Sequence, residues 1–159
     1  MRSSLHLAAE ADTLALGAAA ARALPTAQRP FLVELAGDLG AGKTTFARGL
    51  LQALGVTRPI RSPSYGLLEL YDLAGRQVLH LDLYRLHDPE ELENLGLRDY
   101  HVPGSLWLVE WPERGAGRLP VADARLAFSP GSDGHAVALT ALSAAGEEWL
   151  ARLSQGQNS

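Results

Sequence analysis

Four residues near the end of the first third of the chain have the types and spacing of a phosphate-binding loop. Gly37, Gly42, Lys43 and Thr44 fit the pattern G-x-x-x-x-G-K-[ST]. In such a loop, backbone N–H groups surround phosphate oxygens, the lysine reaches the β- and γ-phosphates, and the hydroxyl binds Mg²⁺. The pattern therefore predicts a site for a nucleoside triphosphate with magnesium.

The residues around this loop have the arrangement that the motif requires. An apolar run, 31–35, predicts a strand before the loop, and 45–54 repeats apolar residues at helical spacing after it. Lys43 is also the only lysine in a chain whose other basic residues are all arginine. A compact ammonium fits among phosphate oxygens where a planar guanidinium is too wide. The alternative is a glycine-rich turn with an incidental lysine.

The loop is expected to bind phosphate mainly through its backbone. Its glycines allow angles that other residues avoid, so the N–H groups of 40–45 can point inward. A helix beginning near Lys43 adds the positive end of its dipole. Asp38 is expected to face outward or to cap a backbone N–H. The predicted cofactor-binding residues of this segment are Asp38, Leu39, Gly40, Ala41, Gly42, Lys43, Thr44 and Thr45.

Two acidic residues each end an apolar strand and are candidates for the second magnesium partner that a P-loop needs. The run 106–110 suits a buried parallel strand beside the P-loop strand, so Glu110 is assigned to magnesium or its water shell. Asp82, which ends 78–82, is assigned to orienting or activating the attacking water. For each, the alternative is a solvated acid at a strand end. The predicted catalytic residues are Asp82, Glu110 and Lys43, and the predicted metal ligands are Thr44 and Glu110.

Three further features have competing interpretations. The loop 62–65 (SPSY) either orders around the γ-phosphate or is an ordinary turn. Trp111 could lie over the site, offer a partner surface, or fill the core. His80, Asp82 and His87 lack a full ligand set, so no histidine metal site is predicted.

The whole pattern predicts a single α/β domain over residues 1–159, a P-loop NTPase-like three-layer fold with a mixed central sheet flanked by helices. A strand over 3–7, a hairpin over 66–73 and 76–83, and late strands over 125–128 and 136–142 complete the sheet. Helices are expected over 10–24, from Asp88 onward and over 146–153, with 153–159 as a frayed tail.

Composition limits the possible function classes. The absence of cysteine excludes disulfides, thiol catalysis and cysteine-ligated zinc. No apolar run approaches a membrane span and the start does not resemble a signal peptide, so the cytoplasm is expected. The net charge is −4 and the arginines form no run. If the substrate is a polynucleotide, a partner protein is expected to provide most of the contacts that bind it.

Several motifs together resemble the bacterial TsaE (YjeE) family. They occur in family order and cover about half the chain: GDLGAGKTTFARGL (37–50), SPSY (62–65), HLDLYRL (80–86), DPEELENLGLRDY (88–100) and LVEWPERG (108–115). One departure is Ser64, where the family usually has threonine; both carry a hydroxyl.

This resemblance implies an ATPase that supports threonylcarbamoyladenosine (t6A) formation in tRNA. The implied cofactors are ATP and Mg²⁺. The implied partners are TsaB- and TsaD-like proteins, which carry the transferase chemistry, so tRNA is reached only through them, with no DNA or membrane involved. By similarity, Lys43 and its loop bind ATP phosphates, Thr44 and Glu110 hold magnesium, and Asp82 serves hydrolysis. Trp111 is then near the nucleotide and Thr13 near the base, and ATP turnover resets the assembly.

Two other functions use the same loop. A small-molecule kinase needs a lid with arginines, which the stretch 111–118 (WPERGAGR) could supply. A GTPase switch ranks lowest, because an Asn-Lys-x-Asp motif would need a second lysine.

Overall fold

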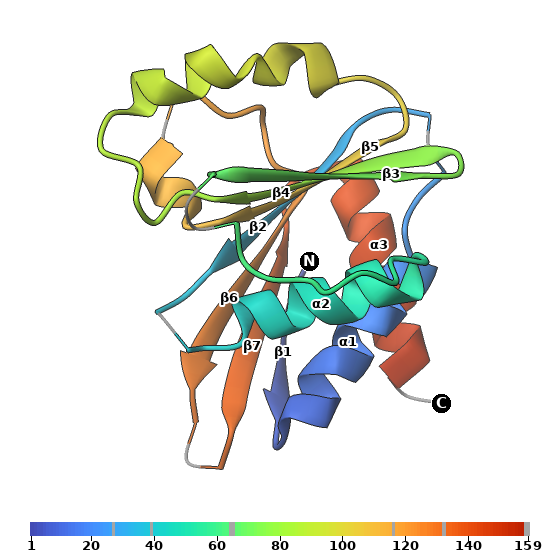
Figure 1. Ribbon diagram of the computed structural model, residues 1–159. Coiled ribbons are helices and arrows are strands. Elements are labelled where there is room, and N and C mark those ends of the chain that lie inside the picture. The colour runs from blue at the N-terminus through green and yellow to red at the C-terminus, as the bar shows by residue number, and fades with distance from the viewer. Residues whose placement is uncertain (27, 39, 64–65, 116, 132, 158–159) are drawn as a thin grey trace.

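The computed structural model describes residues 1–26, 28–38, 40–63, 66–115, 117–131 and 133–157 (Figure 1). Strands, α-helices and 3₁₀ helices (η) follow one another as β1 (Arg2–Leu7), α1 (Glu10–Arg22), β2 (Phe31–Ala36), α2 (Lys43–Ala53), β3 (Leu68–Leu73), β4 (Arg76–Asp82), η1 (Pro89–Leu95), η2 (Leu97–Tyr100), β5 (Ser105–Glu110), η3 (Pro112–Gly115), β6 (Ala124–Pro130), β7 (His135–Ala141) and α3 (Ala144–Gln157). None of the helices in these ranges is long and apolar enough to cross a membrane.

The strands form one mixed sheet in the order β1-β7-β6-β2-β5-β4-β3. β2 lies in the middle and is parallel to both β5 and β6, and β4 is parallel to β5. The outer strands β3, β7 and β1 run antiparallel to their neighbours. The predicted mixed sheet is therefore confirmed, as are the β3–β4 hairpin and the position of β5 beside the P-loop strand. Every residue of β5 is buried, as expected for a strand covered on both faces.

Two layers cover the sheet, which confirms the three-layer prediction. α1, α2 and α3 lie on one face, and η1 and η2 lie on the other (Figure 1). The side chains of β2 alternate between the two cores: Val33 and Leu35 pack with the α-helices, while Leu32 packs with the η side and with Trp107 of β5. Each central strand is thus anchored from both sides.

α1 and α2 cross at glycines, which brings their backbones into close approach. A Cβ on Gly17 would lie 2.3 Å from the carbonyl oxygen of Phe46, and a Cβ on Gly49 would lie 2.3 Å from that of Leu14. These distances are far below an ordinary contact, so the crossing requires glycine at both positions. The contact ties α1 to the helix that follows the glycine loop.

Three boundary predictions were wrong. The segment after Asp88 forms two short 3₁₀ helices; Asp88 still caps the first by accepting from the Glu90 N–H at 3.0 Å, but Gly96, with φ 66°, ends it after seven residues. α1 ends at Arg22 rather than at residue 24. α3 extends from Ala144 to Gln157, so residues 153–157 continue a helix instead of fraying.

Candidate functional site

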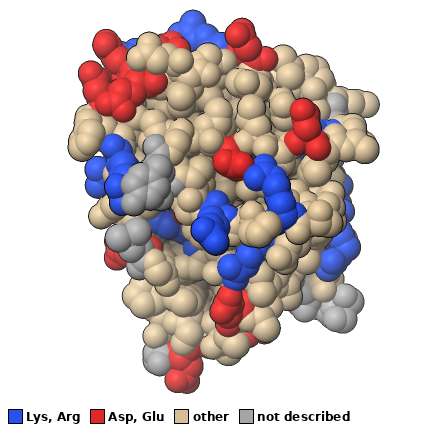
Figure 2. Space-filling model, in the orientation of Figure 1, with Lys and Arg blue, Asp and Glu red and all other residues tan. Residues whose placement is uncertain are grey.

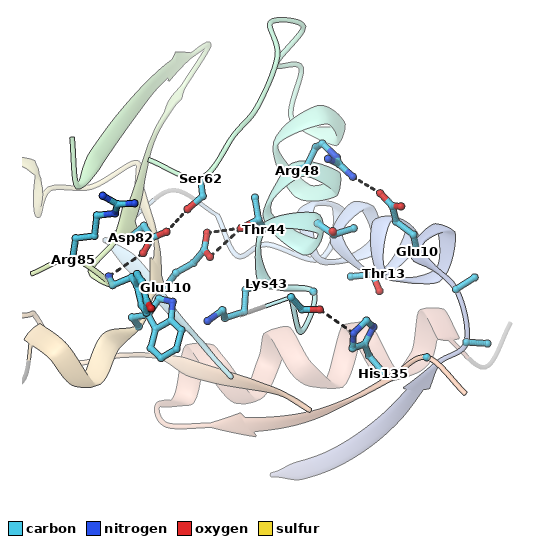
Figure 3. Close-up of a pocket in the computed structure, with 18 residues that line it drawn as sticks. Glu10, Thr13, Lys43, Thr44, Arg48, Ser62, Asp82, Arg85, Glu110 and His135 are labelled. Carbon is cyan, nitrogen blue, oxygen red and sulfur yellow. Dashed lines mark hydrogen bonds and ion pairs between the residues drawn. The ribbon is translucent and has the colours of Figure 1, made fainter. Parts of the chain in front are cut away.

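A cavity of about 650 Å³ opens where the carboxyl ends of β4 and β5 meet the start of α2 (Figure 3). Ligands of open α/β sheets bind at this edge, outside the carboxyl ends of parallel strands. The cavity is lined by nine of the predicted site residues, which come from positions far apart in the chain: Thr13, Gly40, Gly42, Lys43, Thr44, Thr45, Asp82, Glu110 and Trp111.

The remaining predicted residues of the loop are placed differently. Asp38 is exposed, in agreement with the expectation that it faces outward. Ala41 is buried, and its N–H donates to the Asp38 carbonyl at 3.2 Å, so this amide closes the turn instead of facing the cavity. Leu39, and Ser64 and Tyr65 of the loop 62–65, lie outside the described residues.

The glycine loop has the backbone shape that its sequence predicts. Gly40 has φ 77° and Gly42 has φ 111°, both in the region that favours glycine. α2 begins at Lys43, directly after Gly42. Thr13 of α1 lies close to the loop: its methyl carbon is 3.7 Å from the position that a Cβ on Gly42 would occupy. The first turn of α2 therefore opens onto the cavity, next to the residue expected near the base.

Lys43 is almost completely buried, with 4% of its surface exposed. Its Nζ donates to the Gly37 carbonyl and lies 3.8 Å from the centre of the Trp111 ring, a cation–π contact. Burial lowers the pKa of this ammonium, while the carboxylates of Glu110 and Asp82 act in the opposite direction. The ammonium is thus partly desolvated and held by a carbonyl and by a ring that lines the cavity.

Glu110 connects α2 to the sheet. Thr44 Oγ1 donates to Glu110, 3.1 Å from Oε1 and 3.3 Å from Oε2, and His80 Nε2 lies 2.6 Å from Oε2. Glu110 is only 2% exposed, so these bonds satisfy a carboxylate that water barely reaches. The hydroxyl–carboxylate pair predicted to hold magnesium is therefore in contact. The histidine was considered only as a metal ligand and its contact with Glu110 was missed.

Asp82 lies next to Glu110 in the β4–β5 register, and its two oxygens have different partners. Oδ2 accepts from the Ser62 hydroxyl, and Oδ1 accepts from the Tyr84 N–H at 3.0 Å. The loop 62–65 thus meets the predicted hydrolytic acid through its first serine. A carboxylate has about four lone-pair positions, so two donors leave it able to accept from a water.

Trp111 follows Glu110 at the mouth of the cavity and has φ 56°, unusual for a residue with a side chain. Its ring is half-buried and lies 5.0 Å from the Tyr84 ring. Arg114 lies over both rings, and Arg118 pairs with Glu90. The described residues that line the cavity include neither arginine of the proposed kinase lid.

Several other residues of the cavity were not predicted. Arg48 of α2 pairs with Glu10 of α1 at 2.5 Å, and His135 Nε2 lies 3.1 Å from the Gly40 carbonyl oxygen (Figure 3). Arg48 could have been found, because it follows Thr44 by four residues and so shares its helix face. Glu10 and His135 reach the site only through the packing of α1 and the β6–β7 turn, for which the sequence has no local signal.

Comparison with known proteins agrees with this geometry. A family model described as threonylcarbamoyl adenosine biosynthesis protein TsaE matches residues 7–136. The tRNA threonylcarbamoyladenosine biosynthesis protein TsaE of Bacillus subtilis is 34% identical over 128 residues, which are 80% of each chain. Its Haemophilus influenzae counterpart is 53% identical over 96 residues, which are 60% of this chain but only 61% of that relative.

A solved structure extends the likeness to nearly the whole chain. The crystal structure of Bacillus subtilis YdiB matches with a TM-score of 0.82 at 28% identity, covering 99% of this chain and 97% of that one. The sheet, the glycine loop and the helix that follows it define the class: an α/β protein with a P-loop NTPase-like fold. Within that class, the chain belongs to the TsaE family.

Proposed function

We propose that this chain binds ATP with magnesium in the cavity, hydrolyses the ATP, and acts as the ATPase subunit of the cytoplasmic machinery that makes t6A in tRNA. The description of the family and the names of the relatives support the t6A part. The main support for nucleotide binding is the position of Lys43. Its nearly buried ammonium lies at the start of a helix, between a glycine loop and two carboxylates. Phosphate oxygens are the natural counter-charge at such a place.

The residues of the cavity fit ATP and magnesium. A volume of about 650 Å³ is within the usual range for a small-molecule site, about 300–1,000 Å³. Thr44 and Glu110 offer oxygen ligands, which Mg²⁺ prefers, and phosphates and waters would supply the others. When bound, magnesium would add positive charge against the phosphate oxygens as they are transferred.

The side chains of the chain itself have distinct roles in this proposal. Lys43 exchanges the Gly37 carbonyl for β- and γ-phosphate oxygens, which compensate its charge better. Thr44 keeps its hydrogen on Glu110 and turns its lone pairs toward the metal side. Asp82, held by Ser62 and the Tyr84 N–H, accepts a hydrogen bond from the attacking water and orients it.

TsaB- and TsaD-like proteins are the proposed partners, and they would hold the tRNA. The net charge of −4 supports this division, because a chain that grips a polynucleotide alone usually shows a basic surface. On the face shown in Figure 2, Lys and Arg side chains near the middle have acidic side chains above and below them. We therefore expect slow ATP hydrolysis by the chain alone and faster hydrolysis with both partners.

Calorimetry of nucleotide binding tests the proposal, with and without magnesium. Lys43→Ala should weaken ATP binding about 10- to 100-fold, because it removes one or two charge-assisted hydrogen bonds. Glu110→Ala should weaken ATP binding measured in the presence of magnesium but leave ATP binding measured in EDTA unchanged. Arg152→Ala, which removes a cation on α3, is the matched control and should bind like wild type. Unchanged ATP affinity in Lys43→Ala would reject the phosphate role, and equal losses with and without magnesium would reject the role of Glu110.

A further inference from the structure

The contact between His80 and Glu110 goes beyond the roles assigned so far. His80 lies on β4 with none of its surface exposed, and its Nε2 is 2.6 Å from Glu110 Oε2. In the β4–β5 register His80 faces Leu108, two residues before the Asp82–Glu110 pair. Side chains two apart on a strand share a face, so His80 and Asp82 approach the site from the same side of the sheet.

Hydrogen-bond accounting assigns the tautomer of the ring. An ionised carboxylate only accepts, so the short contact requires the ring hydrogen on Nε2. In the part of the chain that the structure describes, His80 Nδ1 is the one buried side-chain nitrogen or oxygen without a partner. With the hydrogen on Nε2, Nδ1 is left as an unpaired acceptor, which proteins tolerate better than an unpaired buried donor. His80 is therefore a donor directed at Glu110.

Two donors on one carboxylate restrict its rotation. The last torsion of a glutamate is broad, so a carboxylate held by a single hydroxyl can turn in place. Here the Thr44 hydroxyl on α2 lies 3.1 Å from Oε1 and 3.3 Å from Oε2, while His80 on β4 binds Oε2 alone, at 2.6 Å. Together they fix the plane of the carboxylate, and because the ring binds only Oε2, Oε1 is left beside the Thr44 hydroxyl and available to the proposed metal.

We propose that His80 is a positioning residue that orients the Glu110 carboxylate for magnesium; this rests on the proposed function. The competing account is that His80 only satisfies a buried acid and adds stability. The two accounts differ in metal affinity, because losing an outer hydrogen bond to a metal ligand typically weakens metal binding about 10- to 100-fold. If the bond is purely structural, its loss should lower the folding stability but leave the metal affinity of the folded protein unchanged.

Three substitutions separate the two accounts. His80→Leu removes the hydrogen-bond donor and puts an apolar side chain in its buried position. His80→Gln carries an amide nitrogen at the reach of Nε2, whereas His80→Asn carries it only at the reach of Nδ1. Gln should therefore preserve the bond and Asn should not. His87→Leu changes an exposed histidine on the loop after β4 and is the matched control.

The readout is Mn²⁺ binding to the ADP complex, followed by electron paramagnetic resonance, with ADP affinity in EDTA measured in parallel. His80→Leu and His80→Asn should bind Mn²⁺ about 10- to 100-fold more weakly than wild type, while His80→Gln and His87→Leu stay close to it. ADP affinity in EDTA should not change in any variant.

Wild-type Mn²⁺ affinity in His80→Leu, or equal affinities in the Gln and Asn variants, would overturn the positioning role. If the Leu variant does not fold, the comparison of Gln with Asn decides. Failure of the wild-type chain itself to bind ADP or Mn²⁺ would instead count against the proposed function.

Discussion

Gly17→Ala offers a sharp test of how α1 is held against α2, the helix that follows the glycine loop. The added Cβ would lie 2.3 Å from the Phe46 carbonyl oxygen and 2.7 Å from the Leu50 nitrogen. Both are backbone atoms and cannot rotate away, so the helices must separate by roughly 1 Å to restore an ordinary contact. Such overpacking typically costs about 1–3 kcal/mol, against about 1 kcal/mol gained from the better helix propensity of alanine.

Because the added Cβ would meet two backbone atoms at 2.3 and 2.7 Å, the overpacking cost should lie near the top of its range, about 3 kcal/mol. The net loss expected from Gly17→Ala is then about 2 kcal/mol, which corresponds to a fall in Tm of about 4–8 °C for a domain of this size. Urea unfolding and scanning calorimetry measure it. Gly156→Ala is the matched control, because a Cβ there meets nothing within 4 Å, and it should not destabilise the chain. Thr13 is one turn from Gly17 on the same helix face, so ATP should also bind more weakly to Gly17→Ala. Wild-type stability in Gly17→Ala would refute the close crossing.

Two further predictions concern Asp82, the proposed hydrolytic acid, and an alkaline titration. Asp82→Asn keeps an oxygen for the Tyr84 N–H but loses the negative charge, so ATP turnover should fall by about 10²-fold or more while ATP affinity changes little; a variant with full turnover would exclude Asp82 from hydrolysis. Burial raises the pKa of the Tyr71 phenol above its usual 10.0, so its neutral form is favoured by folding. The stability that the neutral phenol contributes is complete below pH 10 and is lost as pH rises through the folded pKa. Tyr71→Phe should remove this part of the loss of folding stability at high pH, as measured by urea unfolding at a series of pH values. Parallel curves of stability against pH for the two proteins would contradict the assignment.

The local parts of the site could be predicted because their chemistry is encoded in neighbouring residues. The glycines of 37–42 require positive backbone angles at the places where the structure has them, and apolar periodicity marks β2 and α2 on either side. Glu110 ends a run that is apolar throughout, and the structure places that run beside β2. Helix ends were predicted less well, because α3 continues past Leu153, its last buried apolar residue, into residues that carry no apolar pattern.

The partners of these residues were decided by the tertiary structure alone. No local pattern indicates that His80 meets Glu110 thirty residues later, or that Glu10 reaches Arg48. The burial of Lys43 beneath Trp111 also depends on how β5 leads into the mouth of the cavity. Sequence patterns predict backbone conformation because the interactions that set it, such as steric limits and local hydrogen bonds, act between residues close in sequence. Which polar groups share a buried space is set by sheet order and helix crossing, which depend on contacts across the whole chain.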